Sequence, residues 1–209
     1  MQRDYTIYRL VVGAYQENCY ILTSDRDTVI IDPGAEGEKI INLLEENKLR
    51  PSKILLTHAH PDHFGAVEPL RQHYGIACYV SKDDNTMLHS RSESMKAALG
   101  LDSALDADVF YEDAKLNFLD KPLTVLETPG HTPGGVCIQY EDILFSGDTL
   151  FHMSIGRTDL PGGDSNTLFK SLSKLMTLDD AVNVLPGHGA GTTIGFERQH
   201  NPFINRMSL

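Results

Sequence analysis

Three histidines and one aspartate directly after an apolar segment are the feature that most constrains this chain of 209 residues. Residues 53–57 form a short, mostly apolar run, which is typical of a buried strand. His58, His60, Asp62 and His63 follow it within six positions. A solvated polar loop has no structural need for three imidazoles beside a buried strand. The pattern therefore indicates a metal site.

The spacing within this cluster favours two metal ions over one. His58 and His60 are two residues apart on an extended segment, so their side chains project to the same side. Pro61 is suited to the first turn of a helix, which places Asp62 and His63 after a change of chain direction. The two pairs can therefore face adjacent points in space. Imidazole and carboxylate ligands suit Zn²⁺, Fe²⁺ or Mn²⁺.

Three later residues occur in a matching context. His131, Asp148 and His188 each follow an apolar run and an intervening glycine. A lone histidine after a strand is more often structural than a ligand. Three such positions in one chain, together with the first cluster, favour the ligand interpretation and complete the set that two ions need.

Two residues of the loop after Asp148 are candidates for substrate binding. His152 is a candidate for lining the pocket. Arg157 could bind a substrate carboxylate through its fixed guanidinium, or it could hold the loop together through Asp159. His73, His89 and His200 lie in polar stretches and are expected at the surface, and the three cysteines are expected to be packed rather than reactive.

The composition limits the kinds of partner and the cellular location that are expected for this chain. The formal net charge is −11 and there is no tract of lysine or arginine, so nucleic acid is not expected to bind. No apolar stretch is long enough to span a membrane, and the N-terminus has no visible signal peptide. Three widely spaced cysteines imply no disulfide framework, which favours the cytoplasm. The expected partner is a small molecule, and the oligomeric state is left open.

Apolar and turn patterning predicts an α/β chain of two packed sheets with helices outside. The predicted strands are 5–15, 18–24, 28–32, 53–57, 76–81, 123–130, 134–140, 142–148 and 181–187, and the predicted helices are 36–50, 62–75, 165–176 and 194–204. Pro69 is expected to kink or break the helix at 62–75. Residues 82–113 are expected to be helical or irregular cover outside the core.

Together these residues resemble the metallo-β-lactamase superfamily. The resemblance rests on THAHPDHFG at 57–65, on His131, Asp148 and His188, and on IDPG at 31–34, and it extends from about residue 5 to residue 203. It implies an αββα sandwich of two mixed sheets, with helices on the outer faces and a dinuclear metal site at one edge. By resemblance, the first metal is held by His58, His60 and His131, the second by Asp62, His63 and His188, and Asp148 bridges them.

Within the superfamily the chain resembles a short, glyoxalase II-like subgroup of hydroxyacylglutathione hydrolases, through GRTDLPGGD at 156–164 and ERQHNPF at 197–203. The resemblance implies hydrolysis of a thioester such as S-lactoylglutathione, with two divalent ions, Zn²⁺ foremost and Fe²⁺ or Mn²⁺ as alternatives. Asp62 would orient the attacking hydroxide. Full-length glyoxalase II has an added helical C-terminal domain for glutathione, whereas this chain is expected to be one hydrolase domain over 1–209.

Three other functions are compatible with parts of this pattern. A persulfide dioxygenase of the same superfamily holds one iron, for which His58, His131 and Asp148 could serve, although the second set of ligands favours the hydrolase. A β-lactamase is disfavoured, because the dinuclear enzymes commonly have cysteine in place of Asp148. A purely structural metal site is disfavoured because such sites usually close with four ligands.

Overall fold

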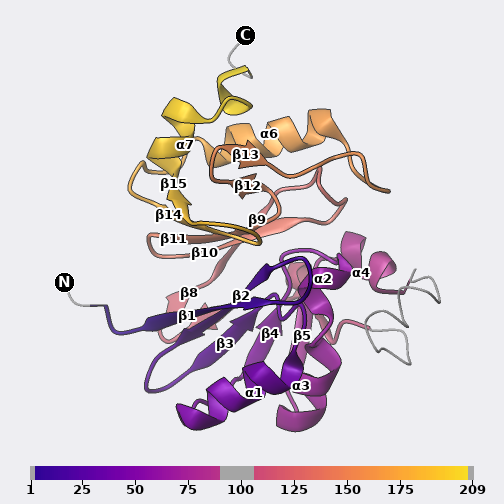
Figure 1. Cartoon of the computed structure of the whole chain (residues 1–209), viewed down its shortest axis with the longest axis vertical. Coiled ribbons are helices and arrows are strands. Elements are labelled where there is room, and N and C mark those ends of the chain that lie inside the picture. Colours follow the sequence, from indigo (N-terminus) through magenta and orange to yellow (C-terminus); the bar gives the residue numbers. More distant parts are fainter. Residues whose placement is uncertain (1–2, 90–105, 207–209) are drawn as a thin grey trace.

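Two β-sheets packed face to face form the centre of the molecule, and helices cover their outer faces (Figure 1). The computed structural model describes residues 3–89 and 106–206. The two sheets are both mixed, with parallel and antiparallel neighbours. The predicted αββα sandwich with helices outside is thereby confirmed.

The first sheet contains six strands in chain order. These are β1 (Thr6–Val12), β2 (Glu17–Thr23), β3 (Thr28–Ile31), β4 (Lys53–Leu55), β5 (Ala77–Val80) and β6 (Val109–Phe110). β1 to β3 form an antiparallel meander, whereas β3 to β6 run parallel. The carboxyl ends of β3 and β4 therefore lie side by side at one edge of the sheet.

The second sheet has five strands in the order β15-β14-β11-β10-β9. Their bounds are β9 (Thr124–Glu127), β10 (Val136–Tyr140), β11 (Ile143–Gly147), β14 (Asn183–Pro186) and β15 (Thr192–Thr193). β10 is antiparallel to both β9 and β11, and β11 is parallel to β14. β9, β11 and β14 thus run in one direction, so their carboxyl ends also meet at one edge.

Apolar side chains fill three layers between these elements. α1 (Gly37–Glu46) and α3 (Val67–Tyr74) cover the first sheet, and α6 (Ser165–Leu175) and α7 (Ile194–His200) cover the second (Figure 1). Leu168, Leu172 and Leu175 are fully buried on one face of α6, as the spacing predicts. The Asp164 side chain caps this helix by accepting from the Thr167 amide at 2.7 Å.

The helix predicted at 62–75 is two helices, α2 (Pro61–Phe64) and α3, and the expected break at Pro69 is wrong. Pro69 lies in the first turn of α3, where no helical hydrogen bond needs its missing amide. The break is at Gly65 and Ala66, because the turn after β3 packs against the backbone there. A Cβ on Gly65 would lie 2.3 Å from the Gly34 carbonyl oxygen, and the Ala66 amide donates to Pro33.

The expectation for residues 82–113 is also corrected. α4 (Lys82–His89) is helical as expected, but Leu88 belongs to the core, β6 extends the first sheet, and Tyr111 is buried between the sheets. Residues 90–105 lie outside the described part of the chain. The remaining short elements are η1 (Tyr111–Asp113), β7 (Asn117–Phe118), β8 (Lys121–Pro122), β12 (Leu150–Phe151), β13 (Ser154–Ile155) and η2 (Ile204–Arg206). Across the described ranges, no helix has the length and apolarity needed to cross a bilayer.

Candidate metal centre

All seven candidate ligands gather where strands of both sheets end. His58 and His60 follow β4, and α2 carries Asp62 and His63. The other three, His131, Asp148 and His188, follow β9, β11 and β14 of the second sheet. The centre is therefore assembled at the edge where the carboxyl ends of the strands meet.

The first cluster consists of His58, His60 and His131, each offering one ligand atom within 4.8 Å of the others. His60 Nδ1 faces His131 Nε2 at 2.9 Å, and the His58 ring lies edge-on to both neighbours with centroid separations of 4.9 Å. His58 and His131 are almost completely buried. Three imidazoles thus converge on one point.

The second cluster consists of Asp62, His63 and His188, and Asp148 lies between the two clusters. His188 Nε2 is 3.3 Å from Asp62 Oδ2. Asp148 Oδ1 is 3.4 Å from His63 Nε2, while its Oδ2 is 3.6 Å from both His131 Nε2 and His188 Nε2. One carboxylate therefore faces nitrogen atoms of both clusters.

Backbone and carboxylate oxygens fix the orientation of the rings. His131 Nδ1 donates to the Arg157 carbonyl at 2.7 Å, and His188 Nδ1 donates to the Tyr15 carbonyl at 3.1 Å, because a carbonyl oxygen can only accept. His63 Nδ1 donates to Asp32 Oδ2 at 3.0 Å. Because Nδ1 is held by these oxygens, Nε2 is the atom that each ring directs toward the centre, which is the orientation that metal-binding histidines adopt.

Several of these atoms have the chemistry of ligands and no other partner. In the described part of the chain, His58 Nε2, His63 Nε2 and Asp148 Oδ1 are buried without a hydrogen bond. Buried polar atoms without partners cost free energy, and neighbouring lone pairs repel. A divalent cation at each cluster would satisfy these atoms, so the nitrogen and oxygen donors fit the implied metals.

Asp32 orients the site without being needed as a ligand. It accepts from the Thr57 amide at 2.7 Å, from Thr57 Oγ1 at 2.5 Å and from His63 Nδ1. Thr57 Oγ1 lies in turn 3.1 Å from His58 Nδ1. Asp32, His58 and His63 also form a third close group, but the three bonds to Asp32 already use its oxygens. Sequence reasoning assigned Asp32 no role, although it follows a buried strand as the ligands do.

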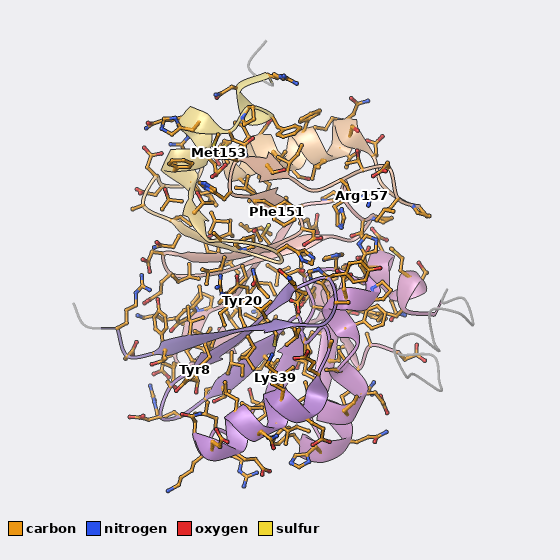
Figure 2. The ribbon with its side chains drawn as sticks, viewed as in Figure 1. Tyr8, Tyr20, Lys39, Phe151, Met153 and Arg157 are labelled. Carbon is orange, nitrogen blue, oxygen red and sulfur yellow. The ribbon has the colours of Figure 1, made fainter. Side chains whose placement is uncertain are left out.

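The β1–β2 hairpin holds the His188 loop in place. The Asn18 side chain donates to the carbonyls of Pro186 and Gly189 at 2.9 and 3.0 Å, and the Tyr20 hydroxyl donates to Pro186 at 2.8 Å. Figure 2 shows Tyr20 where the two halves of the molecule face each other. Glu17 is buried beside His63, and burial raises its pKa to about 10. No local pattern in the sequence marks these three residues.

The two candidate substrate residues have partners of their own. His152 stacks on Phe196 of α7, with its Nδ1 3.4 Å from Glu197 Oε1. The exposed Arg157 side chain forms two hydrogen bonds of 2.7 Å with Asp159, so the loop-holding alternative is present in the structure. Substrate binding by His152 and Arg157 stays a prediction.

In the described residues, the other histidines and the cysteines belong to neither cluster. His73 pairs with Glu45 at the surface, and His200 is exposed beside Phe196. The side chain of His89 lies outside the described set. The three cysteines are free and buried, as expected.

The two clusters differ in the protons they hold. Burial lowers the pKa of His58 well below its usual value and that of His60 to about 4, helped by neighbouring imidazoles. Burial also acts to lower the pKa of His63, but the carboxylates of Asp148 and Asp32 outweigh it and raise the pKa well above the usual value. The pKa of His188 is raised in the same way by Asp62 and Asp148, against the effect of burial.

These pKa shifts predict that metal affinity depends on pH differently at the two clusters. Below the raised pKa of His63 or of His188, a cation must displace a proton from that ring, and each displaced proton changes the affinity by about tenfold per pH unit. His58 and His60 are already neutral at pH 6. Lowering the pH from 8 to 6 should therefore weaken the second cluster more than the first. Zn²⁺ titrations of the apoprotein by calorimetry would show this, and a parallel loss at both clusters would contradict it.

Comparison with known proteins gives the family. The sequence profile of the metallo-beta-lactamase superfamily matches residues 12–188. The chain is 42% identical over 207 residues to the probable metallo-hydrolase YqgX of Bacillus subtilis, covering 96% of this chain and 98% of the relative. It is 40% identical over 205 residues to hydroxyacylglutathione hydrolase GloC of Haemophilus influenzae, covering 94% and 97%.

Solved structures agree with this assignment. The B3 metallo-beta-lactamase BLEG-1 superposes with a TM-score of 0.87 at 40% identity, covering 95% of this chain and 99% of that one. TTHA1623, solved in a di-iron-bound form, gives 0.81 at 39% identity with coverages of 94% and 99%. ETHE1 from Myxococcus xanthus gives 0.76 at 25% identity with coverages of 97% and 89%. The chain belongs to the metallo-beta-lactamase superfamily, and its relatives at about 40% identity are named as hydrolases.

Proposed function

We propose that the protein is a two-metal hydrolase that cleaves a small-molecule thioester such as S-lactoylglutathione. The observation that carries the two-metal reading is the position of Asp148 between two complete clusters, 3.4 Å from His63 and 3.6 Å from His131 and His188. The GloC relative supports the thioester substrate, since it is a named hydroxyacylglutathione hydrolase at 40% identity. The reaction converts thioester and water into a carboxylic acid and a thiol.

Different residues of the chain have different roles in this reaction. When bound, two divalent cations acidify a water molecule and polarise the carbonyl of the substrate. His58, His60 and His131 hold one position, and Asp62, His63 and His188 the other. The buried Asp32 and Thr57 keep the rings of His58 and His63 in their orientation. Each group is fixed before substrate arrives, which lowers the reorganisation needed in the transition state.

Asp62 is the residue that we assign to orient the attacking water. Its carboxyl is a quarter exposed, so water reaches it, and its Oδ2 lies 3.3 Å from His188 Nε2. Burial acts to raise the pKa of Asp62, but the bond to His188 and the charge of His63 lower it to about 2. The ionised carboxylate accepts a hydrogen bond from the attacking water and so orients it. No protein nucleophile is needed, and the three cysteines are free and buried.

Nitrogen and oxygen ligands without sulfur support Zn²⁺ as the metal, with Fe²⁺ or Mn²⁺ as alternatives. The di-iron form of TTHA1623 supports testing iron beside zinc. The proposal includes a single hydrolase domain over residues 1–209, a location in the reducing cytoplasm, and no nucleic-acid partner. The net charge of −11 and the free cysteines support the last two points.

A mononuclear-iron persulfide dioxygenase is the second candidate. His58 and His131 share the first cluster, and Asp148 Oδ2 lies 3.6 Å from His131 Nε2, so these three residues are the candidates to hold one iron. The superposition on ETHE1 shows that the chain has the fold of that protein. Asp62, His63 and His188 would then have no use as ligands, although they lie within 4.8 Å of one another. Their clustering favours the hydrolase.

The test compares three substrates on protein loaded with zinc or with iron. S-D-lactoylglutathione should lose its thioester absorbance at a rate that depends on metal and not on oxygen. Glutathione persulfide in an oxygen electrode tests the dioxygenase, and a β-lactam is included because BLEG-1 is a named β-lactamase. Oxygen consumption with one iron per chain, or turnover of the β-lactam alone, would overturn the thioesterase proposal.

A further inference from the structure

A buried carboxylate outside the ligand set connects the loops that carry the first cluster. Asp84 lies in the first turn of α4 and is completely buried. Its Oδ2 accepts from the Ala59 amide at 2.9 Å and from Thr132 Oγ1 at 2.8 Å, and its Oδ1 accepts from the Gly134 amide at 2.6 Å. Figure 1 shows α4 beside α2, next to the level where the two halves of the molecule meet.

The three donors to the Asp84 carboxylate lie on the two loops that carry the first cluster. Ala59 lies between His58 and His60, on the loop that follows β4 of the first sheet. Thr132 directly follows His131, on the loop between β9 and β10 of the second sheet. One side chain therefore bonds to both loops that supply the first cluster. In the described residues, none of its hydrogen bonds reaches Asp62, His63 or His188.

The loop that carries Thr132 and Gly134 packs closely against α4. A Cβ on Gly134 would lie 2.0 Å from Ser81 Oγ and 2.6 Å from the Asp84 amide nitrogen, so the loop approaches α4 as closely as glycine allows. Burial raises the pKa of the Asp84 carboxyl, while the three donors act in the opposite direction by favouring its charged form. A buried carboxylate with three matched donors holds them in one arrangement.

We propose that Asp84 is a positioning residue for the first metal site, which sets the spacing between the His58–His60 pair and His131. The inference rests on the two-metal centre proposed above. Residues behind metal ligands typically change metal affinity by about 10- to 100-fold when they are replaced. His63 and His188 of the second cluster are held by Asp32 and the Tyr15 carbonyl, and in the described residues neither of these bonds involves Asp84, so the effect should be confined to the first cluster.

Asp84→Asn is the direct test. An amide offers one acceptor oxygen in place of two, so at least one of the three donors would face another donor. Asp83→Asn is the matched control, because Asp83 is the adjacent acid on the same helix and is exposed. Thr132→Val removes a single donor with almost no change of volume, and it provides a milder variant if Asp84→Asn folds poorly.

Cadmium NMR on the apoprotein titrated with Cd²⁺ gives a readout for each site, because clusters with different nitrogen and oxygen ligands give separate resonances. Asp84→Asn should raise the dissociation constant of the first site by about 10- to 100-fold and leave the second within about twofold. Thr132→Val should act in the same direction with a smaller effect, and Asp83→Asn should match wild type. Equal weakening of both sites, or none, would overturn the role of Asp84. Failure of the wild-type protein to bind two Cd²⁺ would instead refute the two-metal centre.

Discussion

Replacing His60 by alanine should remove the metal from the first cluster and reduce thioester hydrolysis by about a thousandfold. His60 supplies one of three nitrogens of that cluster, and its Nδ1 faces His131 Nε2 at 2.9 Å. A bound cation contributes several kcal/mol to transition-state stabilisation, and each 1.4 kcal/mol is worth about a factor of ten in rate. Metal analysis and the initial rate on S-D-lactoylglutathione measure the two losses together.

The fold should survive this substitution. The ring contacts described for His60 are with His58 and His131, and it is half-buried at the edge of the sheets rather than in the apolar layers. His73→Ala is the control, since this histidine is exposed on α3 and contacts Glu45 and Tyr74 rather than the metal centre. A His60→Ala protein with wild-type metal content and rate would show that the first cluster is not a metal site.

Gly187→Ala should abolish tight binding at the second cluster, with an affinity loss of at least about 100-fold. A Cβ at this position would lie 2.4 Å from Asp148 Oδ1 and 2.6 Å from His63 Cε1, inside the centre itself. The backbone cannot withdraw, because the Gly187 amide donates to Gly147 at 2.8 Å and its carbonyl accepts from the Asn18 amide at 2.7 Å. The added methyl group therefore displaces ligands.

Gly189→Ala separates this effect from backbone strain. Gly189 has a φ of +76°, so alanine there costs about 1 kcal/mol, but nothing lies within 4 Å of its Cβ. Gly189→Ala should lower the thermal unfolding midpoint and keep both metals. Gly187→Ala should lose the second metal, as measured by calorimetric titration. If both variants bind metal equally, the close packing around Gly187 does not shape the site.

The candidate ligand positions were predictable because a local sequence pattern marks each of them. His58, His131, Asp148 and His188 all follow apolar runs, and a strand end is where a side chain can leave the core and face a shared edge. The parallel arrangement of β3 and β4, and the common direction of β9, β11 and β14, bring those ends together. The sequence pattern thus predicted the fold class and the gathering of seven residues.

Residues whose role depends on tertiary contacts were not predictable. Asp84 is one of two adjacent acids in a polar helix, and only the fold shows that it is buried against Ala59, Thr132 and Gly134. Proline is the local signal for a helix break, so the sequence predicts the break at Pro69, whereas its cause after α2 is the approach of the Gly34 backbone to Gly65. Likewise β6 is too short and too mildly apolar to be recognised without β5 beside it.

A titration of metal-free protein with Zn²⁺, followed by both bound metal and thioester hydrolysis, tests the two-metal account most directly. Asp148 lies between two clusters that each need a cation, so the rate should rise to a plateau at two equivalents of bound zinc per chain. A rate that reaches its plateau at one equivalent, with no further metal bound, would contradict the two-metal centre.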